Sequence, residues 1–284
     1  MKKVGIINTS TSCLDYIDHG YKLKTARMQV IIEDETYVDY IDINAQDFFK
    51  KIEENKDLMP STSTPNYVDF ENLIKEYEEE GYDEVLILTI SSGLSAAYGV
   101  AKNVADEYEG KMNVQAYDTR TSAIVEGYIC LEALKLASEG QSLEEIIPAL
   151  DKLRENNHIL FVVDSLRLLI KNGRLSNASG FIGTALKIKP MLHVNEEGKI
   201  LTLAKVRTSK KAINSMIEQF FTEVEGIENF DVIFITSNNP EMEKHIEERV
   251  FEKYPNVNFI TSPLTPVVGC HTAEKIVGLG YFKR

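Results

Sequence analysis

An apolar run at residues 85–90 leads directly into a hydroxyl-rich loop at residues 91–95, and this junction constrains the fold more than any other stretch. The run consists mainly of Val, Leu and Ile, which is typical of a buried strand. After the loop, apolar residues recur at helical spacing, at Ala97, Ala101 and Val104. The sequence therefore predicts a strand, a tight loop and a helix.

Each of three apolar runs in the first half of the chain, at residues 4–7, 85–90 and 113–117, leads to a polar turn and later to a helical pattern. The turns at residues 8–12 and 118–122 are rich in hydroxyls and suit polar contacts at the carboxyl ends of strands. Repeated strand–helix units are typical of a parallel sheet covered by helices.

The pattern changes after residue 156. Residues 191–194 and 200–206 are predicted to pair as an antiparallel hairpin. We therefore predict an α/β fold with two domains, a parallel-sheet domain at residues 1–156 and a mixed α/β domain at residues 157–284, without a flexible linker between them.

Three helix starts are predicted from capping residues. Asn44 is expected to cap one helix, and Ser142 with Glu145 forms a capping box for another. Thr64, followed by a proline, is expected to cap a third. Near the C-terminus, His271 is predicted to stand at a helix start.

The chain is acidic. Its 284 residues include 31 Lys and Arg against 44 Asp and Glu, a formal charge of -13, and no basic cluster is recognised in it. This balance argues against a nucleic-acid partner and against an anionic membrane surface. No apolar run is long enough for membrane insertion and no cleavable signal pattern is present, so a cytoplasmic protein is expected.

Cysteine spacing argues against a metal site. Cys13, Cys130 and Cys270 are far apart and form no Cys-x-x-Cys or Cys/His cluster, so neither zinc nor a disulfide framework is expected. They are predicted to be buried thiols. No cofactor is expected, and a nucleotide or phosphosugar enzyme is disfavoured because the chain lacks a Gly-x-Gly-x-x-Gly motif and a P-loop.

The loop at residues 91–95 is a candidate anion site. The first amides of a helix have no internal partners and carry the positive end of its dipole, which favours a carboxylate or phosphate. The alternative is a plain connection in which a serine caps the helix. His271 is likewise either a cleft residue or a capping and packing residue.

A serine hydrolase is a second hypothesis. Ser95 lies between small residues after a predicted strand, as in a nucleophile elbow, and His271 follows it in the chain. Asp164 or Asp231 would orient the histidine. The flanking glycines of an elbow are absent, and the hydroxyls suit charge binding better than activation of one nucleophile.

Several short motifs, in order along nearly the whole chain, resemble the DegV family, the fatty-acid-binding subunits of bacterial fatty acid kinase. The collinear order of the motifs makes the resemblance specific. They are Thr62-Ser63-Thr64-Pro65, Ser91-Ser92-Gly93-Leu94-Ser95, Asp164-Ser165-Leu166, Lys171-Asn172-Gly173-Arg174, Lys189-Pro190, Val206-Arg207-Thr208 and Gly269-Cys270-His271-Thr272.

The resemblance implies a non-enzymatic carrier with a DegV-like two-domain fold. One long-chain fatty acid would occupy an enclosed apolar tunnel, with its carboxylate between the domains. By position in the motifs, Thr62 and Ser95 would bind the carboxylate, with the adjacent loop and His271 nearby. The adjacent loop residues are Ser92, Gly93 and Leu94.

The resemblance also implies a partner. A separate fatty acid kinase would phosphorylate the bound carboxylate, and Arg174 and Arg207 would lie on the face that meets the kinase or the acyl phosphate. Two departures from the family pattern stand out. The turn after the first strand, at residues 9–14, lacks both acids of the family, and Ala96 and Ala273 replace glycines.

Overall fold

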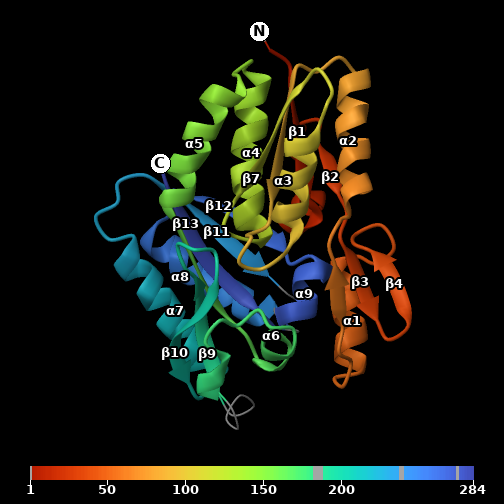
Figure 1. Ribbon diagram of the computed structural model, residues 1–284. Coiled ribbons are helices and arrows are strands. Elements are labelled where there is room, and N and C mark those ends of the chain that lie inside the picture. The colour runs from red at the N-terminus through yellow and green to blue at the C-terminus, as the bar shows by residue number, and fades with distance from the viewer. Residues whose placement is uncertain (1, 182–187, 237–239, 273–274) are drawn as a thin grey trace.

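The computed structural model describes residues 2–181, 188–236, 240–272 and 275–284 (Figure 1). It contains a parallel sheet of four strands in the order β2-β1-β6-β7, with helices on both of its faces. The parallel sheet predicted for the first half of the chain is thus confirmed. The strands are β1 (Val4–Thr9), β2 (Lys24–Ala26), β6 (Glu84–Thr89) and β7 (Asn113–Asp118).

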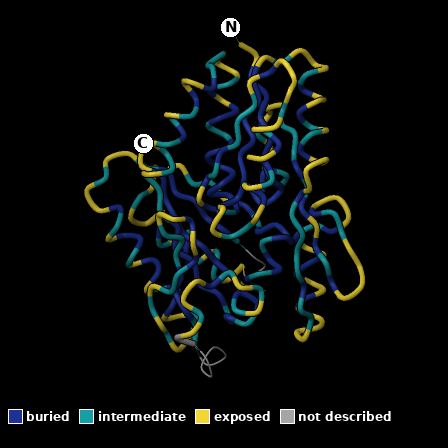
Figure 2. The backbone as a smooth tube through the Cα atoms, in the orientation of Figure 1, coloured by how far each residue is buried: buried dark blue, intermediate teal, exposed yellow. Residues whose placement is uncertain are grey.

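Alternating side chains of these strands enter two separate apolar clusters. Ile7 and Ile87 pack with α2 and α3, whereas Ile6 and Leu86 pack with α4 and α5. Both faces are therefore buried, as a parallel sheet requires (Figure 2). The helices are α2 (Tyr67–Glu79), α3 (Ala97–Glu107), α4 (Ala123–Ser138) and α5 (Leu143–Glu155).

A second, mixed sheet has six strands in the order β10-β9-β8-β13-β11-β12. The predicted hairpin is confirmed as the antiparallel pair β9 and β10. Helices α7 (Ser209–Glu223) and α8 (Pro240–Lys253) cover one face, and the other face turns toward the parallel sheet (Figure 1). We call the parallel sheet with α2 to α5 the first lobe, and the mixed sheet with α7 and α8 the second lobe. The strands are β8 (Asn157–Val162), β9 (Lys189–Val194), β10 (Ile200–Val206), β11 (Phe230–Thr236), β12 (Asn258–Pro263) and β13 (Val277–Lys283).

A third sheet contains two strands that the sequence predicts, near residues 27–32 and 36–41, and one, β5, that it does not. Its order is β4-β3-β5, and it packs with α1 and with α9 near the C-terminus. Elements from both ends of the chain therefore meet beside the two lobes. These elements are β3 (Gln29–Ile32), β4 (Glu35–Val38), β5 (Ser61–Ser63), α1 (Ala45–Glu54) and α9 (Pro266–Thr272).

Two of the four predicted helix positions are correct. Asn44 accepts a hydrogen bond from the amide of Asp47 at the start of α1, and Ser142 forms its capping box at α5. The cap predicted at Thr64 is wrong, because Asn66 caps α2 in a capping box with Asp69. His271 lies in the last turn of α9 rather than at its start.

The mixed sheet begins at Asn157, directly after the predicted domain boundary. The division into two domains after residue 156 stays a prediction. None of the helices in the described part of the chain combines the length and the apolar character that a membrane crossing needs. The three cysteines are free and buried, as predicted.

Candidate functional site

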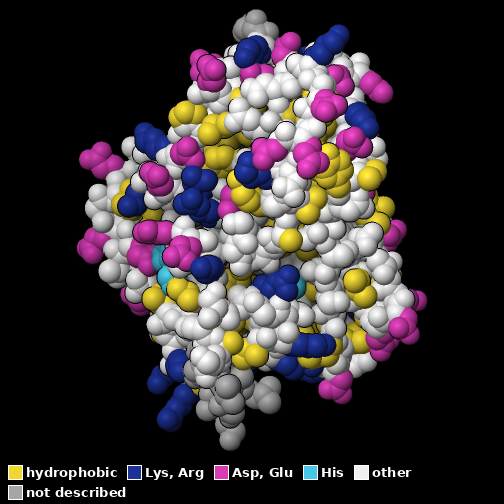
Figure 3. Space-filling view, viewed as in Figure 1, with side chains coloured by type: hydrophobic (Ala, Val, Ile, Leu, Met, Phe, Trp, Pro, Cys, Tyr) yellow, Lys and Arg dark blue, Asp and Glu magenta, His cyan; other side chains and the backbone are white. Residues whose placement is uncertain are grey.

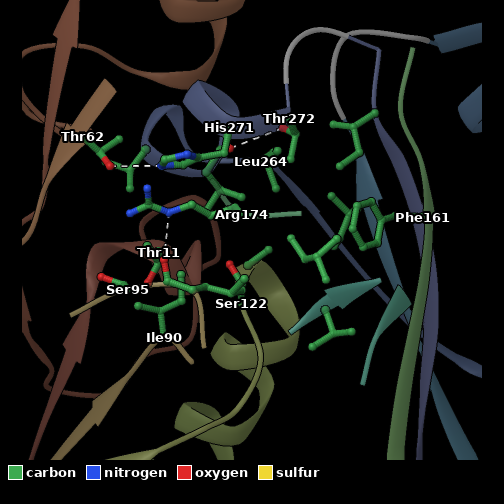
Figure 4. A pocket seen from close by; sticks show the side chains of 18 of the residues that line it. Thr11, Thr62, Ile90, Ser95, Ser122, Phe161, Arg174, Leu264, His271 and Thr272 are labelled. Atoms are coloured by element: carbon green, nitrogen blue, oxygen red, sulfur yellow. Dashed lines mark hydrogen bonds between the residues drawn. The ribbon is translucent and has the colours of Figure 1, made fainter. Parts of the chain in front are cut away.

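A cavity lies where the two large sheets and α9 meet (Figure 4). The space between its walls is about 810 Å³, including the part open to solvent. Most of its polar residues lie toward one end, together with Ile90, whereas Phe161 lies toward the other, so its two ends differ in chemistry (Figure 4).

Thr62 and His271 form one side of the polar end (Figure 4). Thr62 Oγ1 and His271 Nε2 are 3.0 Å apart and share a hydrogen bond, although the two residues are 209 positions apart in the chain. Burial, and secondly the charge of Arg174, lowers the pKa of His271 to about 4. The imidazole is therefore neutral near pH 7. Its Nδ1 atom is buried and has no hydrogen-bond partner.

Arg174 brings a positive charge to the same end. Its Nε donates a hydrogen bond of 3.1 Å to the carbonyl oxygen of Leu94, and one terminal nitrogen donates to the carbonyl oxygen of Asn172. These bonds fix the guanidinium beside Thr62 and His271, where it can neutralise an anion (Figure 4).

The opposite side of the polar end consists of hydroxyls from three loops. Ser95 follows β6, Thr11 belongs to the turn after β1, and Ser122 precedes α4. Ser122 Oγ is buried without a hydrogen-bond partner. An unsatisfied buried hydroxyl is costly, so a polar ligand group at this end would recover a hydrogen bond.

The apolar end is formed mainly by the inner face of the mixed sheet. Ile159 and Phe161 project from β8, Val194 and Ile200 flank the hairpin turn, and Ile235 projects from β11. Alternation along each strand places these side chains on the face opposite α7 and α8.

The loop at residues 91–95 differs in part from expectation. Ser95 and Leu94 line the cavity, but Ser92 and Gly93 are exposed and do not. The amide of Gly93 donates to Ser91 Oγ and that of Leu94 donates to the Ser91 carbonyl, at 3.0 Å each. Helix α3 begins only at Ala97, so the amides at its start lie beyond the residues of this loop that line the cavity.

The same loop contacts the hairpin turn of the other lobe. Ser91 Oγ donates a hydrogen bond of 2.8 Å to the carbonyl oxygen of Gly198. The backbones approach closely, because a Cβ atom on Gly93 would lie 2.8 Å from that oxygen. The turn between β9 and β10 thus connects the two lobes at the side of the cavity.

Arg174 and Arg207 occupy different environments. Arg174 lines the cavity, whereas Arg207 is exposed between β10 and α7. Of the residues suggested by the family motifs, the structure brings Thr62, Ser95, Leu94, His271 and Arg174 to one cavity. Ala273, which replaces a glycine of the family pattern, lies outside the described residues.

Sequence reasoning did not select Thr11 and Ser122 as site residues. The signal was present, because both lie in the hydroxyl-rich turns that follow β1 and β7.

Two buried acids were missed altogether. Glu126 accepts from Thr9 and Thr11, and Asp39 accepts from Thr265. Glu126 of α4 and Asp39, which follows β4, thus place carboxylates beside the turn at residues 9–14, which itself contains no acid.

The geometry does not form a serine hydrolase triad. Asp164 is bound by Lys189, and Asp231 is bound by Tyr128 and Arg284. Since Nδ1 of His271 has no partner, no carboxylate in the described part of the chain orients the ring. Nor do the described residues contain a group of three or more His, Cys, Asp or Glu side chains that could hold a metal ion.

The fold and cavity define a two-lobed α/β protein with a cavity at the junction of its lobes. A family model described as an uncharacterised protein of the DegV family matches residues 3–284, and the chain belongs to that family. A DegV domain-containing protein of Clostridium acetobutylicum is 32% identical over 288 residues, covering 100% of both chains. One from Listeria innocua is 31% identical over 279 residues, covering 98% of each.

Solved structures of relatives have the same fold. DegV of Bacillus subtilis, described as a fatty acid binding protein, matches with a TM-score of 0.88 and 29% identity over 100% of both chains. A fatty acid binding DegV family protein of Streptococcus agalactiae matches with a TM-score of 0.90 and 26% identity, again over 100% of both. The resemblance inferred from the motifs is confirmed at the level of family and fold.

Proposed function

We propose that this protein binds a long-chain fatty acid in the cavity, with the carboxylate at the polar end and the hydrocarbon chain along the apolar end. The observation that carries the proposal is the separation of polar and apolar residues within one cavity (Figure 4). The fatty acid binding described for relatives of the same fold supports it.

The polar end suits an anionic head group. Arg174 supplies the charge, and Thr62, Ser95 and Ser122 supply hydroxyl donors. Hydrogen bonds from such groups to a carboxylate are stronger than those between neutral groups. Neutral His271 can donate from one ring nitrogen without adding charge.

The apolar end suits the chain. Each methylene group removed from water contributes roughly 0.8 kcal/mol, so an alkyl chain of about sixteen carbons has ample driving force without a metal or cofactor. The aliphatic and aromatic side chains that line this end offer no hydrogen bonds that would compete with the head group.

The proposal includes a separate kinase that phosphorylates the bound carboxylate. Arg174 lies at the polar end, where it would also face an acyl phosphate. Arg207 is exposed and would contact the kinase. In this scheme the protein itself is a carrier, and the chemical step belongs to its partner.

Mass spectrometry of denatured protein tests the binding proposal. Protein produced in bacteria is expected to release about one equivalent of fatty acid per chain, because one fatty acid would occupy this cavity. A matched Arg174→Leu preparation is expected to release much less. Absence of fatty acid from several wild-type preparations, together with failure to bind added palmitate, would overturn the proposal.

A further inference from the structure

Glu126 is a buried acid that adjoins the cavity without lining it. It lies in the first turn of α4 and its exposed fraction is 0%. Thr9 Oγ1 lies 2.7 Å from Oε1, and Thr11 Oγ1 lies 3.0 and 2.8 Å from the two carboxyl oxygens. No Lys, Arg or His is among its hydrogen-bond or ion-pair partners in the described part of the chain.

The two threonines connect Glu126 to the cavity wall. Thr9 Oγ1 accepts from the amide of Ile90 at 3.1 Å and lies 2.8 Å from Thr11 Oγ1. Thr11 and Ile90 both line the cavity. Glu126 is therefore separated from the cavity by a single hydroxyl group, that of Thr11.

The protonation state of Glu126 decides whether Thr11 can donate a hydrogen bond to a ligand. A hydroxyl has one hydrogen to donate. When Glu126 is ionised, Thr11 donates that hydrogen to the carboxylate and presents only lone pairs to the cavity. When Glu126 is protonated, its own hydrogen can go to Thr11, and the Thr11 hydrogen becomes free for another acceptor.

We propose that Glu126 is a positioning residue: its protonated form holds Thr11 as a hydrogen-bond donor toward an anionic head group, so that ligand binding is coupled to the proton on Glu126. This inference rests on the proposed fatty acid binding at the polar end of the cavity. An ionised Glu126 opposes the ligand twice, through the lost donor and through like charge behind Thr11.

The charged and titratable groups around Glu126 agree with this coupling. Burial and, to a smaller extent, the charge of Asp118 on β7 raise the pKa of Glu126 to about 8, although hydrogen bonds from Thr9 and Thr11 lower it. Burial keeps the neighbouring Cys13 and Cys130 thiols protonated by raising their pKa. On the outer side of α4, Asp231 of β11 is paired with Arg284.

The other buried acid and the buried histidine described at the cavity and the adjoining turn have pKa values well away from 8. The pKa of His271 is lowered to about 4, chiefly by burial, and that of Asp39 is raised to about 6 by burial. Arg174 stays charged because a guanidinium is not deprotonated in proteins. A pH effect near pH 8 therefore reports on Glu126.

The test uses the full-length, delipidated protein and dodecanoate as the probe. Titration calorimetry in buffers of different ionisation enthalpy measures proton uptake on binding, at pH 6.5 and at pH 9. The wild type is expected to take up almost no proton at pH 6.5 and close to one at pH 9. Its dissociation constant is expected to rise about tenfold between pH 7 and pH 9.

Two variants break the connection and one serves as a control. Glu126→Gln carries a permanent amide donor and is expected to lose the proton uptake and the pH dependence. Thr11→Val lacks the connecting hydroxyl and is expected to keep only the part of both effects that comes from like charge. Glu132→Gln removes a carboxylate from the same helix near Lys135 and is expected to titrate like the wild type.

Each outcome bears on the inference. Wild-type binding without proton uptake at pH 9, or uptake that persists in Glu126→Gln, would overturn it while leaving the proposed function intact. Absence of dodecanoate binding at every pH would instead remove the proposed function and the inference with it.

Discussion

At the scale of single residues, burial decides which polar groups at the cavity carry charge. His271 is neutral near pH 7 because its ring is buried beside Arg174. Arg174 keeps its charge and is held by carbonyl oxygens rather than by an acid. The head-group end thus has a net positive charge within an acidic chain.

The loop at residues 91–95 contains one serine that lines the cavity, Ser95, and one that does not, Ser92. We expect Ser95→Ala to weaken fatty acid affinity by about tenfold to a hundredfold, because a hydrogen bond to a charged group contributes roughly 1.5–3 kcal/mol. Ser92→Ala is the matched control, since Ser92 is exposed and outside the cavity. Titration of delipidated protein with palmitate measures both. Equal losses in the two variants would contradict the assignment of Ser95.

Asp39 makes stability depend on pH. Burial raises its pKa to about 6 in the folded protein, despite hydrogen bonds from Thr265, Ser10 and the Val267 amide that lower it. Because the folded pKa lies above the unfolded value of 3.8, its stabilising contribution is present below that value and is lost as pH rises through about 6.

Asp39→Asn removes this titration. The stability of the wild type relative to the variant is expected to fall by about 3 kcal/mol from pH 4 to pH 7. Urea unfolding at several pH values measures the difference. Asp34→Asn, at an exposed turn position, is the control and should follow the wild-type profile. Parallel profiles for Asp39→Asn and wild type would refute the expectation.

At the scale of elements, the cavity depends on β5 and α9, whose positions the local sequence patterns did not predict. Strand β5 positions Thr62, and α9 positions His271 in its last turn rather than its first. Strand β13 was not predicted, yet it lies between β8 and β11 in the mixed sheet. Its pairing with β8, more than a hundred residues earlier in the chain, has no local signal.

The hairpin turn connects the lobes, and Gly198 tests that connection. Gly198 has φ of +74°, and a Cβ atom there would lie 2.0 Å from Ser91 Oγ. Gly226 has φ of +78° with nothing within 4 Å of the same position, so Gly226→Ala adds backbone strain alone.

We expect Gly198→Ala to reduce the free energy of unfolding by about 1–3 kcal/mol more than Gly226→Ala, because the turn must move away from the loop at Ser91. Fatty acid is also expected to dissociate faster from Gly198→Ala. Urea unfolding and stopped-flow release of a fluorescent fatty acid measure the two effects. Equal behaviour of the two variants would show that the contact between the lobes is unimportant.

At the scale of the whole molecule, charge is distributed unevenly. The chain has a net charge of -13, but residues 167–211 hold ten Lys and Arg against two Asp and Glu. The expectation that no basic cluster interrupts the chain is therefore wrong. Figure 3 shows Lys and Arg side chains over the lower part of this face, where α6 (Arg167–Lys171), β9 and β10 lie, with few acids among them.

This basic segment suits an acidic surface on the proposed kinase, with Arg207 as an exposed member. Arg207→Ala is expected to lower the rate of acyl-phosphate formation with a purified fatty acid kinase by about tenfold at low salt, and by less at high salt. Fatty acid affinity should not change. Lys102→Ala, on α3 outside the segment, is the control. A loss confined to fatty acid binding would place Arg207 in the binding site instead.

From the amino-acid sequence come the strand–helix order of the parallel sheet, most element positions, the family, and the expectation that Thr62, Ser95 and His271 lie together. These are local properties, because periodicity, capping residues and short motifs act over a few positions. The packing of the folded chain is needed to show that Thr11 and Ser122 join the same cavity, and that Glu126 and Asp39 are buried beneath it. Those contacts depend on sheet order and on packing between segments as distant as Thr62 and His271, and no local pattern encodes them.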